Sequence, residues 1–399
     1  NYFSDLFLFF FAYFFVSHYL LLYDEETSTK KELHMNYICR KCKKTYPIET
    51  MDYTCSCGGL FHLEYKKTPI DFDLLRTSQV RSIQRYSSSL PLFDEDITMK
   101  EGGTPLISLT SSLMGKADYF MPTLSFKDRG AVILVSMMKK YGITHCALDS
   151  SGNAGTAVAA YCARGGIECD VFVPSHTSDK KIAQIEAHGA TVHKIEGTRE
   201  DTGKATVEFI EKEKVFYASH IYNPHFYEGT KTYMYEVFEQ YHHTLPEIII
   251  VPVGNGTLLM GVAIALKELK EWGYIDQYPQ VVAVQASLCA PIYHAYTQKA
   301  TSLEVIETSL TLAEGIASAA PSRGDELIEL IYDIGAIVVS VSEQEIIMGQ
   351  EYLAHRGVFV EYTSSANYAG YKRFIEDYPK WKEKSALIPL CGAGLKSVH

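Results

Sequence analysis

One lysine has neighbours that could make its amine chemically reactive. Lys127 lies in the segment LSFKDRG (residues 124–130), between an aromatic ring and an Asp-Arg pair. A lysine amine is almost wholly protonated at neutral pH, but burial lowers its pKa and frees a lone pair that can attack an aldehyde. The same lysine on a solvated helix start would be an ordinary surface charge. The segment alone leaves both interpretations open.

Three glycine-rich segments, each at the end of an apolar run, could bind a small ligand. DSSGNAG (149–155) and VPVGNGTLL (251–259) both lead into helical patterns. Glycines at such a junction leave backbone N–H groups free at a helix N-terminus, which attracts anions. The second segment lacks the lysine of a P-loop and the full dinucleotide fingerprint, so a single phosphate monoester suits it. The third, LIPLCGAGLK (387–396), places Cys391 after the last apolar run.

The elements that must position these groups alternate between apolar runs and helical patterns. Strands are expected at 145–149, 169–174, 215–219, 247–254, 281–286 and 385–390. Such alternation predicts an α/β fold, in which a parallel sheet is covered on both faces and binds ligands at its carboxyl edge. The glycine-rich segments and Lys127 would meet at that edge. Together they predict a small phosphorylated cofactor that forms a Schiff base with the lysine.

Four cysteines near the start of the chain have the spacing of metal ligands. Cys39 and Cys42 form a C-x2-C pair, and after twelve intervening residues Cys55 and Cys57 form a C-x-C pair. Two such pairs can hold zinc tetrahedrally, and the site would be structural because all four positions would be filled. A small β-ribbon without metal is the alternative. His62 is a spare ligand candidate, but packing in the core is its simpler role.

The composition is that of an ordinary globular chain. The 399 residues are 47% hydrophobic and 21% charged, and a formal net charge of −11 argues against a general nucleic-acid binder. The other cysteines are scattered through apolar segments, which is typical of a reducing compartment and predicts a cytoplasmic protein. Residues 1–34 contain the apolar stretch 6–23, interpreted as upstream residues foreign to the protein, with a membrane anchor as the alternative.

The order and spacing of five segments resemble those of fold-type-II pyridoxal-phosphate enzymes of the tryptophan synthase beta superfamily. These segments are PTLSFKDRGA, SSGNAG, EGTKTYMYE, VPVGNGTLL and CGAGLK. The chain looks most like the threonine synthase branch, whose members often begin with a cysteine-rich ribbon. The resemblance implies two three-layer α/β domains with the cofactor in the cleft between them, after a zinc-ribbon-like module. The expected boundaries are 35–66 for the module, 67–140 plus 246–399 for the larger domain, and 141–245 for the smaller domain.

The resemblance also implies a role for each matching residue. Lys127 would form the Schiff base with pyridoxal 5'-phosphate and would then move protons at the substrate. Phe126 would border the cofactor ring, Asn153 would hydrogen-bond its phenolic oxygen, and Cys391 would face its pyridine nitrogen. The phosphate would be held by Gly254, Asn255, Gly256 and Thr257, and the substrate carboxylate by Ser150, Ser151, Gly152 and Ala154.

The implied reaction is that of threonine synthase, in which O-phosphohomoserine and water give threonine and phosphate. Departures from the branch concern the substrate: Ser151 and Ala154 stand where threonine is usual, and Leu124 stands where glycine is usual. Residues 311–331 resemble a segment of threonine dehydratases. A threonine or serine ammonia-lyase is therefore the alternative, and a catalytically silent cofactor-binding protein is a third hypothesis. A homodimer that acts on a small-molecule amino acid is expected, because related folds are commonly dimers.

Other polar residues near these segments have simpler interpretations. Asp128 and Arg129 are expected to fix the start of a helix rather than to catalyse. Lys180 and Lys181 could meet a substrate phosphate or simply begin a helix. Glu314 could approach the cofactor or the substrate amine.

Overall fold

The computed structural model describes residues 35–150, 152–197 and 199–396, and these residues group into one compact unit. The apolar stretch at 6–23 lies outside the described residues. Among the helices that are described, none is long and apolar enough to cross a membrane.

A three-stranded antiparallel sheet forms the cysteine-rich module. In it, β1 (Asn36–Cys39) lies between β2 (Thr45–Pro47) and β3 (Phe61–Glu64). Phe61 is buried and stacks on Tyr37 with ring centroids 5.5 Å apart, which gives the module its own apolar centre. The segment that follows, from residue 66 to residue 100, holds only α2 (Phe72–Leu75) and a 3-10 helix at Ile83–Ser89.

The larger of the two α/β sheets has six strands in the order β12-β11-β10-β13-β5-β4. All neighbours are parallel except β4 and β5, which are antiparallel. The strands are β4 (Leu106–Ser108), β5 (Leu113–Lys116), β10 (Ile248–Pro252), β11 (Gln280–Ala286), β12 (Ile337–Val341) and β13 (Ala386–Pro389). Side chains of β10 alternate between two cores: Ile248 packs in a cluster with Phe374 of α13 (Tyr362–Asp377), and Ile249 packs in a cluster with Leu259 of α9 (Thr257–Glu271). The sheet is therefore the middle of three layers.

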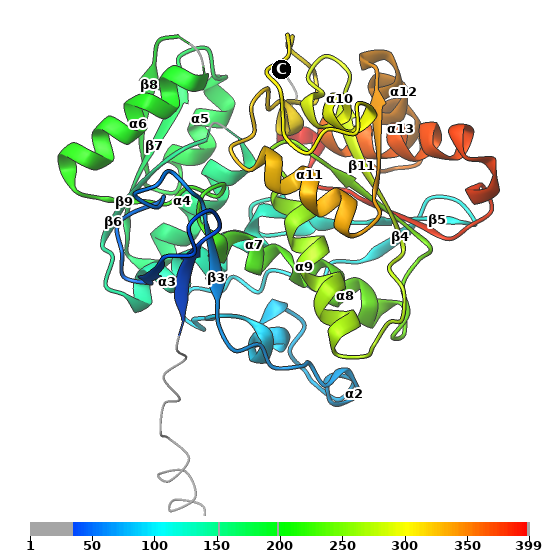
Figure 1. The fold of residues 1–399 in the computed structure, drawn as a ribbon, viewed down its shortest axis with the longest axis horizontal. Helices are drawn as coiled ribbons and strands as arrows, with labels where there is room; N and C mark the ends of the chain where they lie inside the picture. The colour runs from blue at the N-terminus through cyan, green and yellow to red at the C-terminus, as the bar shows by residue number, and fades with distance from the viewer. Residues whose placement is uncertain (1–34, 151, 198, 397–399) are drawn as a thin grey trace, which may run out of the picture. The chain divides into compact units, whose positions relative to one another are not determined.

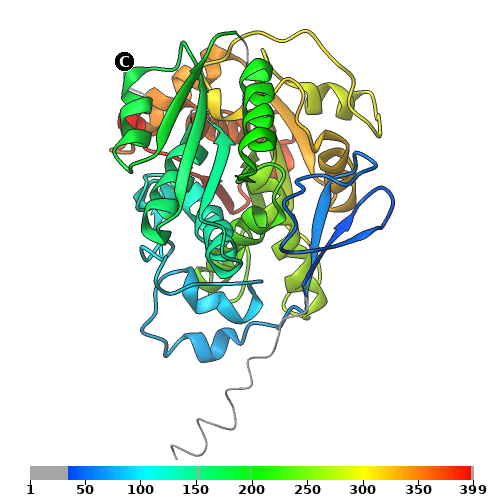
Figure 2. The same cartoon turned by 90° about the vertical axis from the view of Figure 1, so that its left-hand side faces the viewer.

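The smaller sheet has four parallel strands in the order β8-β7-β6-β9. Its strands are β6 (His145–Asp149), β7 (Glu168–Pro174), β8 (Thr191–Ile195) and β9 (Phe216–Tyr217). The helices that flank it are α4 (Asn153–Gly165), α5 (Asp179–Glu186) and α6 (Arg199–Glu213), and they lie on both of its faces (Figure 2). All four strands come from within the predicted smaller domain, 141–245. The domain boundaries themselves stay a prediction.

The remaining helices connect and cover the two sheets (Figure 1). They are α3 (Lys127–Lys140), α7 (Pro224–Thr230), α8 (Thr232–Gln240), α10 (Pro291–Thr297), α11 (Gly324–Asp333) and α12 (Glu343–Ala354). α3 packs against both α4 and α7, and α7 packs against α9, so these helices join the layers of the two sheets. The α/β class is confirmed. The expected strands are all present, whereas β4, β5, β8 and β12 were not predicted.

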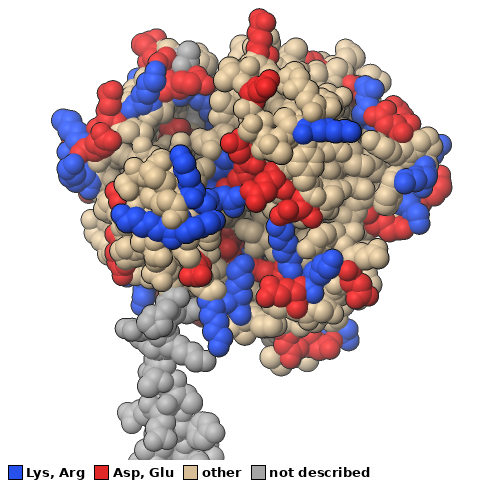
Figure 3. Space-filling model, viewed as in Figure 1, with Lys and Arg blue, Asp and Glu red and all other residues tan. Residues whose placement is uncertain are grey.

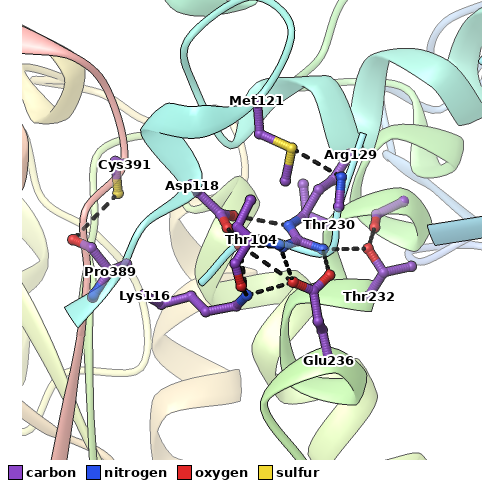
Figure 4. Close-up of polar contacts among 12 residues, drawn as sticks. Thr104, Lys116, Asp118, Met121, Arg129, Thr230, Thr232, Glu236, Pro389 and Cys391 are labelled. Carbon is purple, nitrogen blue, oxygen red and sulfur yellow. Dashed lines mark hydrogen bonds and ion pairs between the residues drawn. The ribbon is translucent and has the colours of Figure 1, made fainter. Parts of the chain in front are cut away.

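A buried ionic network fixes α3 to α8 and β5 (Figure 4). The Arg129 guanidinium, which is fully buried, pairs with Asp118 at 2.8 Å and with Glu236 at 2.9 Å. The ammonium of Lys116 also pairs with Glu236, and the Thr104 backbone N–H donates to the same carboxylate at 2.8 Å. Two cations and two carboxylates therefore balance one another away from water, which gives Arg129 the structural role expected for it.

Asp128 also has a structural position. Its carboxylate accepts hydrogen bonds from the backbone N–H of Thr123, at 2.7 Å, and from the Thr123 hydroxyl. Burial raises the pKa of Asp128 to about 7, although both bonds from Thr123 oppose the shift. The side chain thus holds the bend that precedes α3.

Candidate active site

The start of α3 directs the Lys127 amine toward the start of α9. The Lys127 Nζ donates to the Thr257 Oγ1 at 2.9 Å, and Thr257 is the first residue of α9. The rings of Phe126 and Phe226 have their centroids 4.7 and 5.6 Å from the same nitrogen. Protein atoms crowd the amine, although the residue keeps partial access to solvent.

Burial lowers the pKa of Lys127 from its ordinary 10.5 to about 8. The negative charges of Cys391 and Glu361, when ionised, oppose this shift, and the positive charge of Arg199 adds to it. A pKa near 8 leaves a substantial fraction of neutral amine near neutral pH, where an ordinary lysine has almost none. The amine is therefore prepared for nucleophilic attack on a carbonyl group.

The segment between β10 and α9 forms a cradle in which only glycine fits at two positions. A Cβ on Gly254 would lie 2.8 Å from the Ile316 Cα, and a Cβ on Gly256 would lie 2.2 Å from the Leu327 side chain. Gly256 also has a φ of +76°, in the left-handed region. The neighbouring Asn255 Oδ1 accepts from the Ser318 Oγ at 2.9 Å. With no acidic residue in the first turn of α9, this helix start can bind an anion.

The loop between β6 and α4 brings Asn153 to the same region. A Cβ on Gly155 would lie 2.0 Å from the Ser150 carbonyl oxygen, so the turn is tight. The Asn153 Nδ2 donates to both oxygens of the Glu361 carboxylate, at 3.2 and 2.9 Å. Gly152 precedes the helix and Ala154 is buried within its first turn, whereas Ser151 lies outside the described residues.

The loop after β13 lies directly against the segment that carries Lys127. The Phe126 backbone N–H donates to the Cys391 carbonyl oxygen at 2.9 Å, and Ser125 forms a bridge with Gly392. The Cys391 Sγ lies 3.9 Å from the Pro389 carbonyl oxygen (Figure 4). Burial raises the pKa of the Cys391 thiol well above its ordinary value. Cys391 is therefore a neutral group close to Lys127.

The position that departs from the expected glycine has an unusual backbone. Leu124 has a φ of +61°, and the residue is 44% exposed. A non-glycine residue in the left-handed region is strained by roughly 1–2 kcal/mol, a strain that glycine avoids. The Leu124 carbonyl oxygen accepts from the Ala393 N–H at 3.1 Å, so two loops hold the bend in place.

Comparison with known protein families shows the family to which this chain belongs. Residues 97–392 match the family described as pyridoxal-phosphate dependent enzyme. The chain belongs to this family. Its cofactor is accordingly pyridoxal 5'-phosphate, which has a phosphate monoester and an aldehyde. Both groups fit the site. The phosphate suits the space that a Cβ on Gly254 or Gly256 would fill, and the aldehyde suits the Lys127 amine with its lowered pKa.

Curated relatives of this pyridoxal-phosphate dependent enzyme share most of its length. Threonine synthase of Methanocaldococcus jannaschii is 32% identical over 374 residues, which are 90% of this chain and 92% of the relative. Threonine synthase of Methanosarcina acetivorans is 31% identical over 351 residues, 85% of this chain and 86% of the relative. Together with the family match, they identify the chain as a pyridoxal-phosphate-dependent lyase.

Solved structures confirm the fold. Maize serine racemase superposes with a TM-score of 0.64 at 20% identity, covering 73% of this chain and 88% of its own. A fungal L-serine ammonia-lyase from Rhizomucor miehei superposes with a TM-score of 0.64 at 22% identity, covering 73% and 93%. At such identities the likeness extends to the fold alone.

Three polar residues of the enzyme's candidate site had no role in the sequence analysis. Glu361 accepts from Asn153, and the Lys396 Nζ donates to the Thr123 carbonyl oxygen at 2.8 Å. His220 is buried with a Nδ1 that has no hydrogen-bond partner among the described residues, and burial lowers its pKa well below the ordinary value. Lys396 lies in a recognised segment, but nothing in the sequence connects Glu361 or His220 to this site.

Two further contacts link the smaller sheet's helices to the segment around η3 (Glu314–Ile316). Lys181 at the start of α5 forms an ion pair with Glu314, so these two candidates meet each other. The Arg199 Nη1 donates to the Ala317 carbonyl oxygen at 3.1 Å. Beside this contact lies a cavity of about 480 Å³, whose lining includes Arg199 of α6, Asn255 of the cradle and Tyr53 of the cysteine-rich module.

The four cysteines of the module converge on one point. The sulfur atoms of Cys39, Cys42, Cys55 and Cys57 all lie within 4.8 Å of one another, and none is in a disulfide. Thiolate sulfur is the ligand type that structural zinc prefers. His62 is not part of this group; it pairs with Ile38 across the β1–β3 ladder. Arg40 of the module pairs with Glu326 and Glu329 of α11. Figure 3 shows acidic and basic side chains next to one another on one face of the protein.

Proposed function

We propose that this enzyme is a threonine synthase, which converts O-phosphohomoserine and water into threonine and phosphate. The observation that carries the proposal is the Lys127 amine, 2.9 Å from Thr257 at the end of a cradle that fits only glycine at two positions. The names of the relatives at 31–32% identity support this substrate over others.

Each residue of the site has a task in this reaction. The bound cofactor supplies an electron sink for negative charge at the substrate Cα. The segment 254–257 would hold the cofactor phosphate, and Ser150 to Ala154 would bind the substrate carboxylate. Lys127 would hold the cofactor aldehyde and, once the substrate amine displaces it, would take protons from Cα and Cβ so that phosphate leaves from Cγ. A proton would then be returned to Cγ, water would add its hydroxyl at Cβ, and a proton would be returned to Cα. The neutral Cys391 thiol would face the pyridine nitrogen and leave this nitrogen unprotonated.

Two substrates distinguish this function from its alternatives. The purified enzyme is incubated separately with O-phosphohomoserine and with threonine, and phosphate and 2-keto acid are measured. Release of phosphate without keto acid is the expected result. Keto acid from threonine would instead identify an ammonia-lyase, the function that the dehydratase-like segment 311–331 supports. If neither substrate changes the absorbance of the bound cofactor, the silent cofactor-binding hypothesis stands.

The pKa of Lys127 predicts how cofactor uptake depends on pH. Only the neutral amine attacks the aldehyde, so the rate of uptake by the apoprotein should rise with pH and level off above about 8. Stopped-flow absorbance measures this rate between about pH 6, where the amine is protonated, and about pH 11, where it is neutral. A midpoint near 10.5, the ordinary lysine value, would contradict the burial of the amine.

We propose that the four clustered cysteines hold structural zinc. Elemental analysis of the purified protein should find about one zinc per chain, because one tetrahedral site uses four thiolates. Cys55→Ser should lower the zinc content and the melting temperature, whereas Cys289→Ser, a buried cysteine outside the cluster, should keep the zinc. An unchanged zinc content in Cys55→Ser would rule the site out. Since Tyr53 of this module lines the cavity beside the cradle, zinc removal should also weaken cofactor binding.

We further propose that the enzyme is a cytoplasmic homodimer acting on a small-molecule amino acid. The resemblance to commonly dimeric enzymes supports the dimer. The cysteines of the described residues are all free, which suits a reducing compartment. Light scattering of the purified protein should give twice the chain mass of 44.8 kDa.

A further inference from the structure

The side chain of Asn153 is held by a carboxylate from a distant part of the chain. Glu361 stands directly before α13, and both of its carboxylate oxygens accept from the Asn153 Nδ2, at 3.2 and 2.9 Å. Glu361 is 8% exposed, so little water competes for this contact. The contact joins the first residue of α4, beside the smaller sheet, to the residue that directly precedes α13.

The chemistry of the two groups decides which way the Asn153 amide faces. A carboxylate only accepts hydrogen bonds, whereas an amide can donate through nitrogen or accept through oxygen. Glu361 therefore selects the nitrogen of the amide and excludes the flipped orientation. One N–H can point between two carboxylate oxygens at these distances, which leaves the second N–H of the same nitrogen free for another acceptor.

The surroundings of Glu361 hold its carboxylate in place. Its backbone N–H donates to the Gly392 carbonyl oxygen at 3.1 Å, and a Cβ on Gly392 would lie 2.6 Å from the carboxylate. The loop that carries Cys391 is thus shaped around this side chain. Burial raises the pKa of Glu361, and the hydrogen bond from Asn153 opposes that shift, as do the positive charges of Lys396, Lys181 and Lys127.

We propose that Glu361 is a positioning residue for the cofactor: it holds the Asn153 amide so that an N–H faces the phenolic oxygen of pyridoxal 5'-phosphate. The inference rests on the proposed placement of Asn153 beside that oxygen, and it is independent of which amino acid is the substrate. A donor fixed in this orientation binds the ring oxygen without first turning, which favours cofactor binding.

Glu361→Gln in two backgrounds tests the proposal. Glutamine keeps the size of the side chain but can both donate and accept, so it no longer selects one orientation of Asn153. Cofactor affinity is measured by absorbance titration of the apoprotein, together with the absorption spectrum of the bound cofactor. The variants are Glu361→Gln, Asn153→Ala and the double variant. Glu376→Gln, which changes the 62% exposed Glu376 of α13, the helix that Glu361 precedes, is the matched control.

A role through Asn153 predicts a non-additive result. Glu361→Gln alone should weaken cofactor binding about 10-fold and shift the cofactor spectrum, because a hydrogen bond to a charged group is altered. In the Asn153→Ala background the same change should have less than about a 2-fold effect. Equal effects in both backgrounds, or none in the first, would overturn the proposal. If Glu361→Gln fails to fold, Glu361→Asp, which draws the carboxylate back from the amide, is measured in the same two backgrounds and read in the same way.

Discussion

Lys127→Ala should abolish covalent attachment of the cofactor and slow phosphate release from O-phosphohomoserine by at least about 1,000-fold. The estimate follows from general base catalysis, which contributes about 100- to 10,000-fold, and the covalent role adds to it. The buried amine beside Thr257 is the nucleophile that the site offers to an aldehyde. Absorbance of the purified variant and a phosphate assay measure the two effects.

Two further lysine variants test whether these effects are specific to the Lys127 amine. Lys140→Ala removes an exposed lysine from the other end of α3 and should change neither the spectrum nor the rate. Lys127→Arg keeps the positive charge but removes the nucleophilic amine, so it should be as inactive as Lys127→Ala. A variant at Lys127 that retains the cofactor spectrum of the wild type would place the attachment elsewhere in the chain.

Glu236→Gln should destabilise the protein by about 3–5 kcal/mol, the usual effect of breaking a buried ion pair. The change leaves Lys116 and one side of Arg129 without a counter-charge in a region closed to water. Chemical denaturation of the cofactor-free protein measures the loss. Asp333→Asn, which breaks the exposed Lys267–Asp333 pair, should cost less than about 1 kcal/mol. Equal losses in both variants would mean that the buried network does not stabilise the fold.

The pKa of Glu236 predicts part of the protein's loss of stability in acid. Burial would raise the pKa of Glu236, but the charges of Arg129 and Lys116 outweigh burial and lower the pKa from its ordinary 4.5 to about 2. A depressed pKa means that the unfolded chain binds the proton more readily, so this stabilisation is complete above pH 4.5 and is lost as the pH falls toward 2. In Glu236→Gln, the free energy of unfolding should therefore change less with pH over that interval than it does in the wild type.

The parts of the fold that neighbouring residues in the sequence determine could be predicted from short sequence patterns. Strands β6, β7, β10, β11 and β13 are short apolar runs, and the glycines of 254–256 occupy positions where a Cβ would collide. β8 escaped prediction because its residues are only partly buried and two of five are exposed. The short strands β4 and β5 give too few residues to show a period.

Contacts between distant residues could not be predicted in this way. Glu361 meets Asn153 across 208 positions of the chain, and Arg129 meets Glu236 across 107 positions. In one sequence, a carboxylate before a helix signals only a helix start, and its partner is fixed by packing of the sheets. The sequence shows that Leu124 stands where glycine is usual, but only the structure shows its left-handed φ.

The central place of β13 in the larger sheet has a consequence for folding during synthesis. β13 (386–389) joins β10 to β5, although these partners leave the ribosome much earlier. The smaller sheet needs only residues 145–217 and can form while translation continues. Until residue 389 emerges, β10 and β5 have open edges that other chains can pair with. We therefore expect nascent chains that stall before this point to depend on chaperones.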